Sequence, residues 1–195
     1  MKYVKEFTSH FGRFPLFSFA SARLFFSIKG SNDVYAKKFI SRMLQSGRVF
    51  RITKGDYSFN KNMLAVGLAY KPYYYGLEYA LTYYDLWNQR ANLTVLTTQK
   101  VREGVRVAFG INYVLKRVPQ RLFFGFHRAD SGSGFNIQVS DIEKAFLDMV
   151  YFRRYMSGDT LEKFSNRVDS KKLSSYGGRL GEVFRRRALD MLGLD

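Results

Sequence analysis

Hydrophobic residues recur at helical spacing through most of the first 45 residues. Val4, Phe7 and Phe11 share one face of a predicted helix that Gly12 and Pro15 end. A second predicted helix follows a capping residue at Ser18 and stops at Gly30. Its expected inward positions are Phe17, Ala20, Leu24 and Phe25.

A third helix is predicted to begin in Ser31-Asn32-Asp33, whose short side chains can accept hydrogen bonds from the free amides of a first turn. Gly47 follows it in the usual C-terminal position. The apolar stripe of this helix consists of Ala36, Phe39, Ile40, Met43 and Leu44. Residues 48–52 and 57–59 are then predicted as two strands joined by the Gly-containing turn 53–56.

Three helices followed by a hairpin is the order of a winged helix-turn-helix domain, whose third helix enters the major groove of DNA. Arg and Asn pair with base edges and Lys suits phosphates, and these types occupy the face opposite the stripe. The residues expected to contact DNA are Ser31, Asn32, Tyr35, Lys37, Lys38 and Arg42, with Arg51 and Lys54 on the hairpin. The alternative is that this face is only the solvated side of an amphipathic helix.

The pattern changes near residue 60, where a tyrosine-rich segment replaces the basic helices. We therefore expect two domains, 1–60 and 61–195. In the second, helices are predicted in 64–69, 76–87, 140–150 and 159–192, and strands in 93–97, 105–111, 122–126 and 135–139. The fold class is α+β: an N-terminal winged helix-turn-helix followed by a mixed α+β domain with a small sheet.

Charge points to the class of partner. The chain has 195 residues with 32 Lys+Arg against 16 Asp+Glu, a formal net charge of +16, and 17% of its residues are aromatic. Such apolar content excludes a disordered basic tail, so the charge lies on a folded surface that suits a polyanion. Residues 1–60 hold 11 Lys+Arg and 3 Asp+Glu, a net of +8, and are the more densely basic part.

Several kinds of chemistry are disfavoured by composition. The absence of cysteine excludes thiolate nucleophiles and Cys-based metal sites, and His10 and His127 are too isolated for a His-based site. We therefore expect no cofactor, no metal and no catalytic residue. The apolar stretch 14–26 is interrupted by Ser and Arg, so neither a signal peptide nor a membrane span is predicted, and a cytoplasmic location is expected.

One segment permits an enzymatic alternative. Asp141, Glu143, Lys144 and Asp148 could serve a metal-dependent nuclease, since acids and a lysine can hold a divalent ion and position water. The spacing favours a structural role instead, because an acid two positions before the lysine is missing. On a helix capped at Ser140, Glu143 would bond back to the first turn, and Lys144 and Asp148 would form an i,i+4 pair.

Two other clusters of residues could form binding surfaces. The tyrosines of 70–84 suit either a binding face or the core and its rim. A second basic surface is expected on the last helices; it could bind flanking DNA or an acidic partner, or remain solvated. Its residues are Lys171, Lys172, Arg179, Arg185, Arg186 and Arg187.

Four segments, in order and spacing, resemble the AbiEi family, the antitoxin and transcriptional-regulator half of type IV toxin–antitoxin systems. They are 44–57 (LQSGRVFRITKGDY), 74–81 (YYGLEYAL), 93–98 (LTVLTT) and 139–148 (VSDIEKAFLD). The resemblance implies a winged helix that binds operator repeats in double-stranded DNA, as monomer or dimer, and represses its own operon. It also implies a C-terminal domain that counteracts a nucleotidyltransferase-type toxin.

Overall fold

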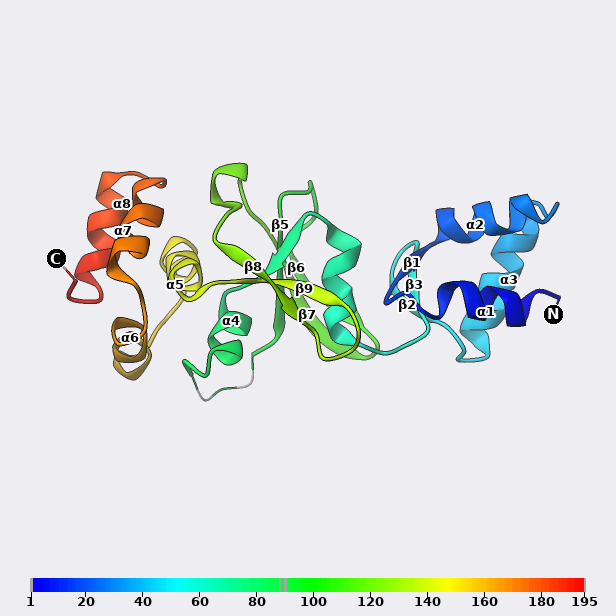
Figure 1. Ribbon diagram of the computed structural model, residues 1–195, viewed down its shortest axis with the longest axis horizontal. Helices are drawn as coiled ribbons and strands as arrows, with labels where there is room; N and C mark the ends of the chain where they lie inside the picture. The colour runs from blue at the N-terminus through cyan, green and yellow to red at the C-terminus, as the bar shows by residue number, and fades with distance from the viewer. Residues whose placement is uncertain (1, 88, 90, 195) are drawn as a thin grey trace. The chain divides into compact units, whose positions relative to one another are not determined.

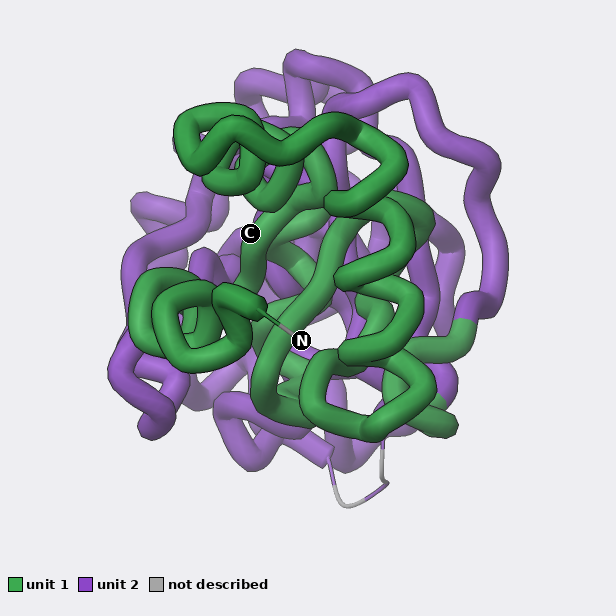
Figure 2. The backbone as a smooth tube through the Cα atoms, turned by 90° about the vertical axis from the view of Figure 1, so that its right-hand side faces the viewer, with its two compact units in different colours: residues 1–69, 107–111 green, residues 70–106, 112–195 purple. Residues whose placement is uncertain are grey.

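The computed structural model describes residues 2–87, 89 and 91–194, which fall into two compact units. Unit 1 runs to Ala69 and includes Val107–Ile111, while unit 2 comprises Tyr70–Arg106 and the chain from Asn112 onward (Figure 2). The chain first passes from unit 1 to unit 2 between Ala69 and Tyr70, whereas the expected boundary lies after residue 60. Both helices and sheets are present, which agrees with the predicted α+β class.

Unit 1 combines helices with a three-stranded antiparallel sheet (Figure 1). Its elements are α1 (Val4–Phe11), β1 (Phe17–Ser18), α2 (Phe19–Ile28), α3 (Asp33–Gln45), β2 (Phe50–Thr53), β3 (Asp56–Ser58) and the 3₁₀ helix η1 (Met63–Tyr70). The strand order is β1-β3-β2, with Phe17 opposite Tyr57 and Phe50 opposite Ser58. The short strand β1 thus joins the segment between the first two helices to the hairpin.

Phenylalanine side chains fill the core of unit 1. The fully buried Phe7 lies 4.7 Å from Phe11, 4.9 Å from Phe39 and 5.5 Å from Phe26 between ring centroids. Each aromatic side chain removes roughly 150–250 Å² from water, so a few rings stabilise a small unit. From the apolar stretch 14–26, Phe17, Ala22 and Phe26 belong to this core, whereas Phe14 and Leu24 are exposed.

The third helix is confirmed close to its predicted form. The Asn32 side chain accepts a hydrogen bond of 3.0 Å from the Tyr35 amide and so caps α3. Ala36, Phe39, Ile40 and Met43 are buried, and Leu44 is half-buried.

The second helix differs from its prediction. Ser18 does cap it, accepting from the Ser21 amide, but Phe17 lies in β1 and outside the helix. A helix that starts at Phe19 turns Ala22 and Phe26 inward, leaving Leu24 62% exposed. The predicted stripe through Ala20 and Leu24 is wrong, because α2 packs into the core of unit 1 through the side that carries Ala22 and Phe26.

Unit 2 is built on a six-stranded mixed sheet of order β6-β7-β5-β4-β9-β8. The strands are β4 (Tyr73–Tyr75), β5 (Leu93–Thr97), β6 (Gly104–Ala108), β7 (Ile111–Arg117), β8 (Phe126–Asp130) and β9 (Asn136–Ser140). The pairs β4–β5 and β8–β9 are antiparallel, and β5–β7 and β4–β9 are parallel. Tyr73, Tyr74 and Tyr75 are buried in β4, so these tyrosines belong to the core.

The helices of unit 2 are α4 (Glu78–Tyr83), the 3₁₀ turn η2 (Gln120–Leu122), α5 (Ile142–Tyr151), α6 (Gly158–Ser165), α7 (Ser170–Gly178) and α8 (Glu182–Asp190). α7 packs against both α5 and α8 (Figure 1). The inward sides of these helices share one core with Tyr74 and Leu96 of the sheet. Within the described residues, no helix is both long and apolar enough to cross a membrane.

Several predictions for unit 2 are corrected. The period-two run 105–111 is divided between β6 and β7, because Phe109 and Gly110 form the turn with φ of 55° and 80°. The strand predicted at 122–126 is replaced by η2 and the start of β8. The predicted helix 64–69 is the 3₁₀ helix η1, and 159–192 holds three helices.

Candidate nucleic-acid interface

The outer face of α3 carries a row of exposed residues with three cations. Lys37, Lys38 and Arg42 are exposed, and Asp33 is the only acid in the helix. Asp33 pairs with Arg23 at 3.5 Å, which offsets its charge. The row, called here the α3 face, consists of Val34, Lys37, Lys38, Ser41, Arg42 and Gln45. Ser41 and Val34 were not among the expected contacts. Their position on this face could have been predicted, because each lies three or four residues from Lys38 along the helix.

Three expected contact residues have structural roles or positions away from this face. The Asn32 side chain is the N-cap of α3. Tyr35 is half-buried: its ring lies 5.3 Å from that of Phe26, and its hydroxyl donates to the Lys2 carbonyl at 3.2 Å. Ser31 is half-buried in the turn before α3. Tyr35 was expected on the outer face, but its aromatic ring is drawn into the phenylalanine core.

The β2–β3 hairpin presents the other two expected residues. Arg51 is exposed on β2, and Lys54 is exposed in the turn. The turn is fixed by the Thr53 hydroxyl, which donates to Asp56 Oδ2 at 2.6 Å, and by Gly55 at φ 104°. This hydrogen bond occupies the only acid of the hairpin and leaves Lys54 at the tip.

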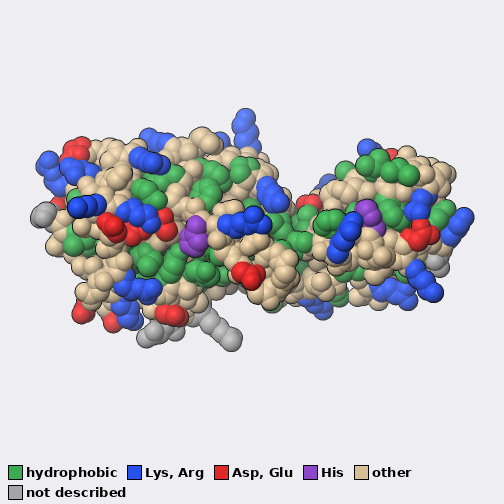
Figure 3. Space-filling model, in the orientation of Figure 1, with side chains coloured by type: hydrophobic (Ala, Val, Ile, Leu, Met, Phe, Trp, Pro, Cys, Tyr) green, Lys and Arg blue, Asp and Glu red, His purple; other side chains and the backbone are tan. Residues whose placement is uncertain are grey.

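The predicted second basic surface is not one continuous set of free cations. Lys172 pairs with Glu143 at 2.7 Å and Asp141 at 3.1 Å, and Arg185 pairs with Glu182. The Arg179 guanidinium lies over the Phe124 ring at 4.8 Å. Lys171, Arg186 and Arg187 are exposed. Lys and Arg side chains are distributed over both units on the face drawn in Figure 3.

The segment proposed for a nuclease alternative forms a buried polar network. Lys144 Nζ contacts Asp148 Oδ1 and donates to the Tyr74 hydroxyl at 2.9 Å, and that hydroxyl donates to Asp148 Oδ2 at 2.9 Å. All three side chains are shielded from solvent. Burial lowers the pKa of Lys144 and raises the pKa of Asp148 and of Tyr74. The predicted i,i+4 pair is confirmed, in the interior of unit 2.

The acids beside this network connect α5 to α7. Asp141, and not Ser140 as predicted, caps α5 by accepting from the Lys144 amide at 2.8 Å. Glu143 was expected to bond back to its own first turn, but it accepts from the Asp169 amide at 2.9 Å. Burial lowers the pKa of Lys172, but its contacts with Glu143 and Asp141 have the larger effect. The pKa of Lys172 is therefore raised on balance. Asp141 and Glu143 thus have structural partners. Among the described residues, no group of three or more His, Asp or Glu side chains could hold a metal ion.

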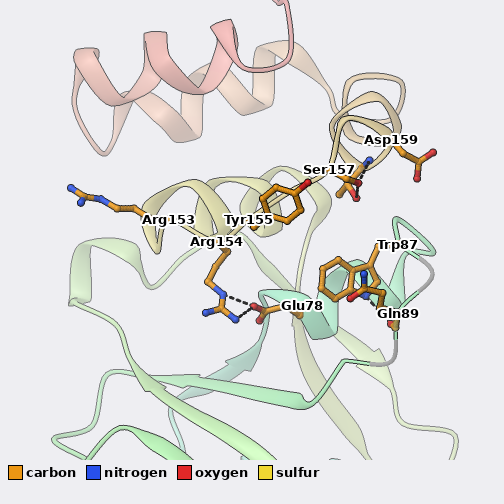
Figure 4. Close-up of a pocket in the computed structure, with 9 residues that line it drawn as sticks. Glu78, Trp87, Gln89, Arg153, Arg154, Tyr155, Ser157 and Asp159 are labelled. Atoms are coloured by element: carbon orange, nitrogen blue, oxygen red, sulfur yellow. Dashed lines mark hydrogen bonds and ion pairs between the residues drawn. The ribbon is translucent and has the colours of Figure 1, made fainter.

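Unit 2 also has a cavity of about 530 Å³ between α4 and the segment that joins α5 to α6 (Figure 4). Glu78 pairs with Arg154 inside it, while Arg153 points away from the other labelled residues. Two acids, Glu78 and Asp159, balance the two arginines of the lining. The charges of the described lining residues therefore cancel, which does not favour a polyanion.

Comparison with known proteins found neither a family model nor a curated protein that matches this chain.

Proposed function

We propose that unit 1 is a winged helix-turn-helix domain that binds double-stranded DNA, with α3 as the recognition helix and the β2–β3 hairpin as the wing. The observation that carries the proposal is the row of Lys37, Lys38 and Arg42 on the α3 face, together with Arg51 and Lys54 on the hairpin. The element order, three helices and a hairpin whose strand β3 pairs with β1, supports the proposal.

The dimensions and side chains of α3 suit the major groove. A helix of 13 residues is about 20 Å long, and a groove about 12 Å wide admits it. Arg42 supplies the fork of donors that pairs with guanine, and Lys37 and Lys38 are suited to phosphates. The packing of Tyr35 against Phe26 holds α3 against α2 on the side opposite to these cations.

For the whole chain we propose a cytoplasmic, sequence-specific transcriptional regulator of the type IV antitoxin kind, without enzymatic activity. It would bind operator repeats as monomer or dimer, repress its own operon and counteract a nucleotidyltransferase-type toxin. This wider proposal is supported by the resemblance of residues 44–57, 74–81, 93–98 and 139–148 to the AbiEi family. The buried and paired state of Lys144 and Asp148 gives the nuclease alternative no support.

The DNA-binding proposal is tested with duplex DNA from directly upstream of the gene and a shuffled duplex of equal length and composition. Specific regulators bind their sites roughly 10³-fold or more tightly than other DNA at physiological salt. We expect such a ratio in fluorescence anisotropy at 150 mM salt. Equal affinity for the two duplexes would contradict sequence-specific binding.

The antitoxin proposal is tested by expressing the adjacent reading frame alone and together with this chain. We expect growth arrest in the first case and recovery in the second. The Arg42→Ala variant should still restore growth if toxin neutralisation depends on unit 2. Growth arrest that persists with the wild-type chain would contradict the antitoxin part while leaving DNA binding untouched.

A further inference from the structure

A shallow cavity of about 550 Å³, open to solvent, lies in unit 1 along α1, with Phe25 of α2 in its lining. Its lining consists of Lys5, Glu6, Ser9, His10, Arg13 and Phe25. None of these residues belongs to the α3 face or to the hairpin. Lys5, Ser9 and Arg13 recur every four residues and so lie along one side of α1 and its C-terminal extension.

The charges of this lining are strongly unbalanced. Its single acid, Glu6, is paired with Lys29. Across the described parts of the chain, no acidic side chain forms an ion pair with Lys5 or Arg13. Two uncompensated cations therefore flank the cavity, with the Ser9 hydroxyl and the His10 imidazole as further hydrogen-bonding groups.

The aromatic side chains orient these groups. The Arg13 guanidinium lies 5.0 Å over the Phe14 ring, and the His10 ring lies 4.6 Å from Phe11 and 5.6 Å from Phe25. A cation–π contact does not use up the N–H donors of a guanidinium, and those donors can bind phosphate through two parallel hydrogen bonds. Phe25 closes one side of the cavity.

We propose that this cavity binds a phosphoryl group, through Arg13 and Lys5 as the charged contacts and Ser9 and His10 as additional hydrogen-bond donors. The group could belong to a free phosphate-bearing molecule or to the backbone of DNA. The two sources share the same chemistry and are separated by the experiment below. The site is independent of the α3 face, so neither proposal depends on the other.

The two histidines of the chain provide the test. The full-length protein is titrated with inorganic phosphate while the imidazole proton resonances are followed by NMR, with sodium chloride at matched ionic strength as reference. The His127→Gln variant assigns the two signals, and His127, exposed on β8 in unit 2, serves as the internal control. We expect a saturable shift of the His10 signal in the millimolar range and none of the His127 signal.

Arg13→Ala should weaken phosphate binding by about tenfold or more, the effect of removing a charge-assisted hydrogen bond. Arg48→Ala, which changes an exposed arginine of unit 1 outside the cavity, should leave it unchanged. Far-UV circular dichroism checks that both variants fold. A His10 response that is linear, or that chloride reproduces, would overturn the proposal, and so would equal effects of the two variants.

DNA affinity identifies the source of the phosphoryl group. If Arg13→Ala also lowers affinity for the upstream duplex, the group is a backbone phosphate; if only phosphate binding is lost, it belongs to a free molecule. Arg42→Ala should reduce DNA binding and leave the His10 titration unchanged. A protein that binds phosphate but no DNA would refute the regulator proposal alone.

Discussion

Lys144 and Asp148 lie one turn apart on α5 and form an ion pair from which solvent is excluded, with the Tyr74 hydroxyl bonded to both. Taking two charges out of water is costly, and the mutual attraction compensates only while both partners are present. The network fixes α5 against strand β4 at the centre of unit 2.

Removal of one partner should therefore be severe. Lys144→Met leaves the Asp148 carboxyl buried without its cation and is expected to cost about 3–5 kcal/mol of unfolding free energy. Urea denaturation followed by the fluorescence of Trp87, the single tryptophan, reports on unit 2. The double variant Lys144→Met/Asp148→Leu should recover most of the loss. A single variant as stable as the wild type would show that the pair does not stabilise the fold.

Gly125 is predicted to tolerate no side chain. Its φ is 68°, and an added Cβ would lie 2.8 Å from Lys144 Cβ and 2.9 Å from Tyr176 Cε2. Gly132 has nearly the same φ, 69°, but open space around it. Both alanine variants bear the conformational cost of a left-handed residue, and Gly125→Ala adds overpacking of about 1–3 kcal/mol. Thermal unfolding of the two variants should separate them by this amount, whereas equal stabilities would refute the close approach.

Unit 2 should lose stability at alkaline pH. Burial raises the pKa of Tyr73 and of Tyr79 to about 12, whereas tyrosine in an unfolded chain ionises near pH 10. The folded state thus holds these two protons more tightly than the unfolded state does. The resulting contribution to the free energy of unfolding is fully present below pH 10 and is lost as the pH rises toward 12. At pH 11.5 the loss is on the order of 1–2 kcal/mol for each tyrosine, because solvent screens part of the effect and ionisation of the folded state is incomplete. In urea denaturation at pH 9 and pH 11.5, Tyr73→Phe should show a smaller decline than the wild type; identical declines would argue against this assignment.

The wing is predicted to contact phosphate. Lys54 lies at the hairpin tip, so Lys54→Ala should weaken DNA binding similarly for the upstream and shuffled duplexes. The slope of log affinity against log salt should become shallower by about 0.9, the value for one phosphate contact. Anisotropy titrations at several salt concentrations from about 50 to 300 mM measure this slope. An unchanged slope would place the hairpin tip away from DNA.

Local signals in the sequence predicted α3 well. Asn32 caps it and Gly47 follows it, and its buried stripe repeats at helical spacing, so no distant contact was needed to define its position. The strand β1 was missed, because two residues carry no periodic pattern and acquire their strand geometry only by pairing with Tyr57 and Asp56. The inward face of α2 was misplaced because it depends on packing of Ala22 and Phe26 against other helices.

The candidate interface was predictable in part, because helical spacing also defines which side chains of α3 face outward. Lys37, Lys38 and Arg42 are exposed as their offset from the stripe requires. The inward position of Tyr35 depends on Phe26, which belongs to another helix. Arg185 pairs with Glu182 three residues earlier in α8, at a spacing that the sequence shows. The ion pairs of Lys172, by contrast, depend on Asp141 and Glu143 at the start of α5. Sequence spacing alone contains no information on such tertiary partners.

The central claim, that the α3 face binds DNA, is tested most directly by comparing Arg42→Ala with Lys100→Ala against the upstream duplex. Both remove one exposed cation, but Lys100 lies in unit 2, outside the proposed interface. Arg42→Ala should lose about 1–3 kcal/mol of binding free energy and part of the preference for the upstream sequence, while Lys100→Ala retains both. Equal affinities of the two variants and the wild type would contradict the assignment of α3 as the recognition helix.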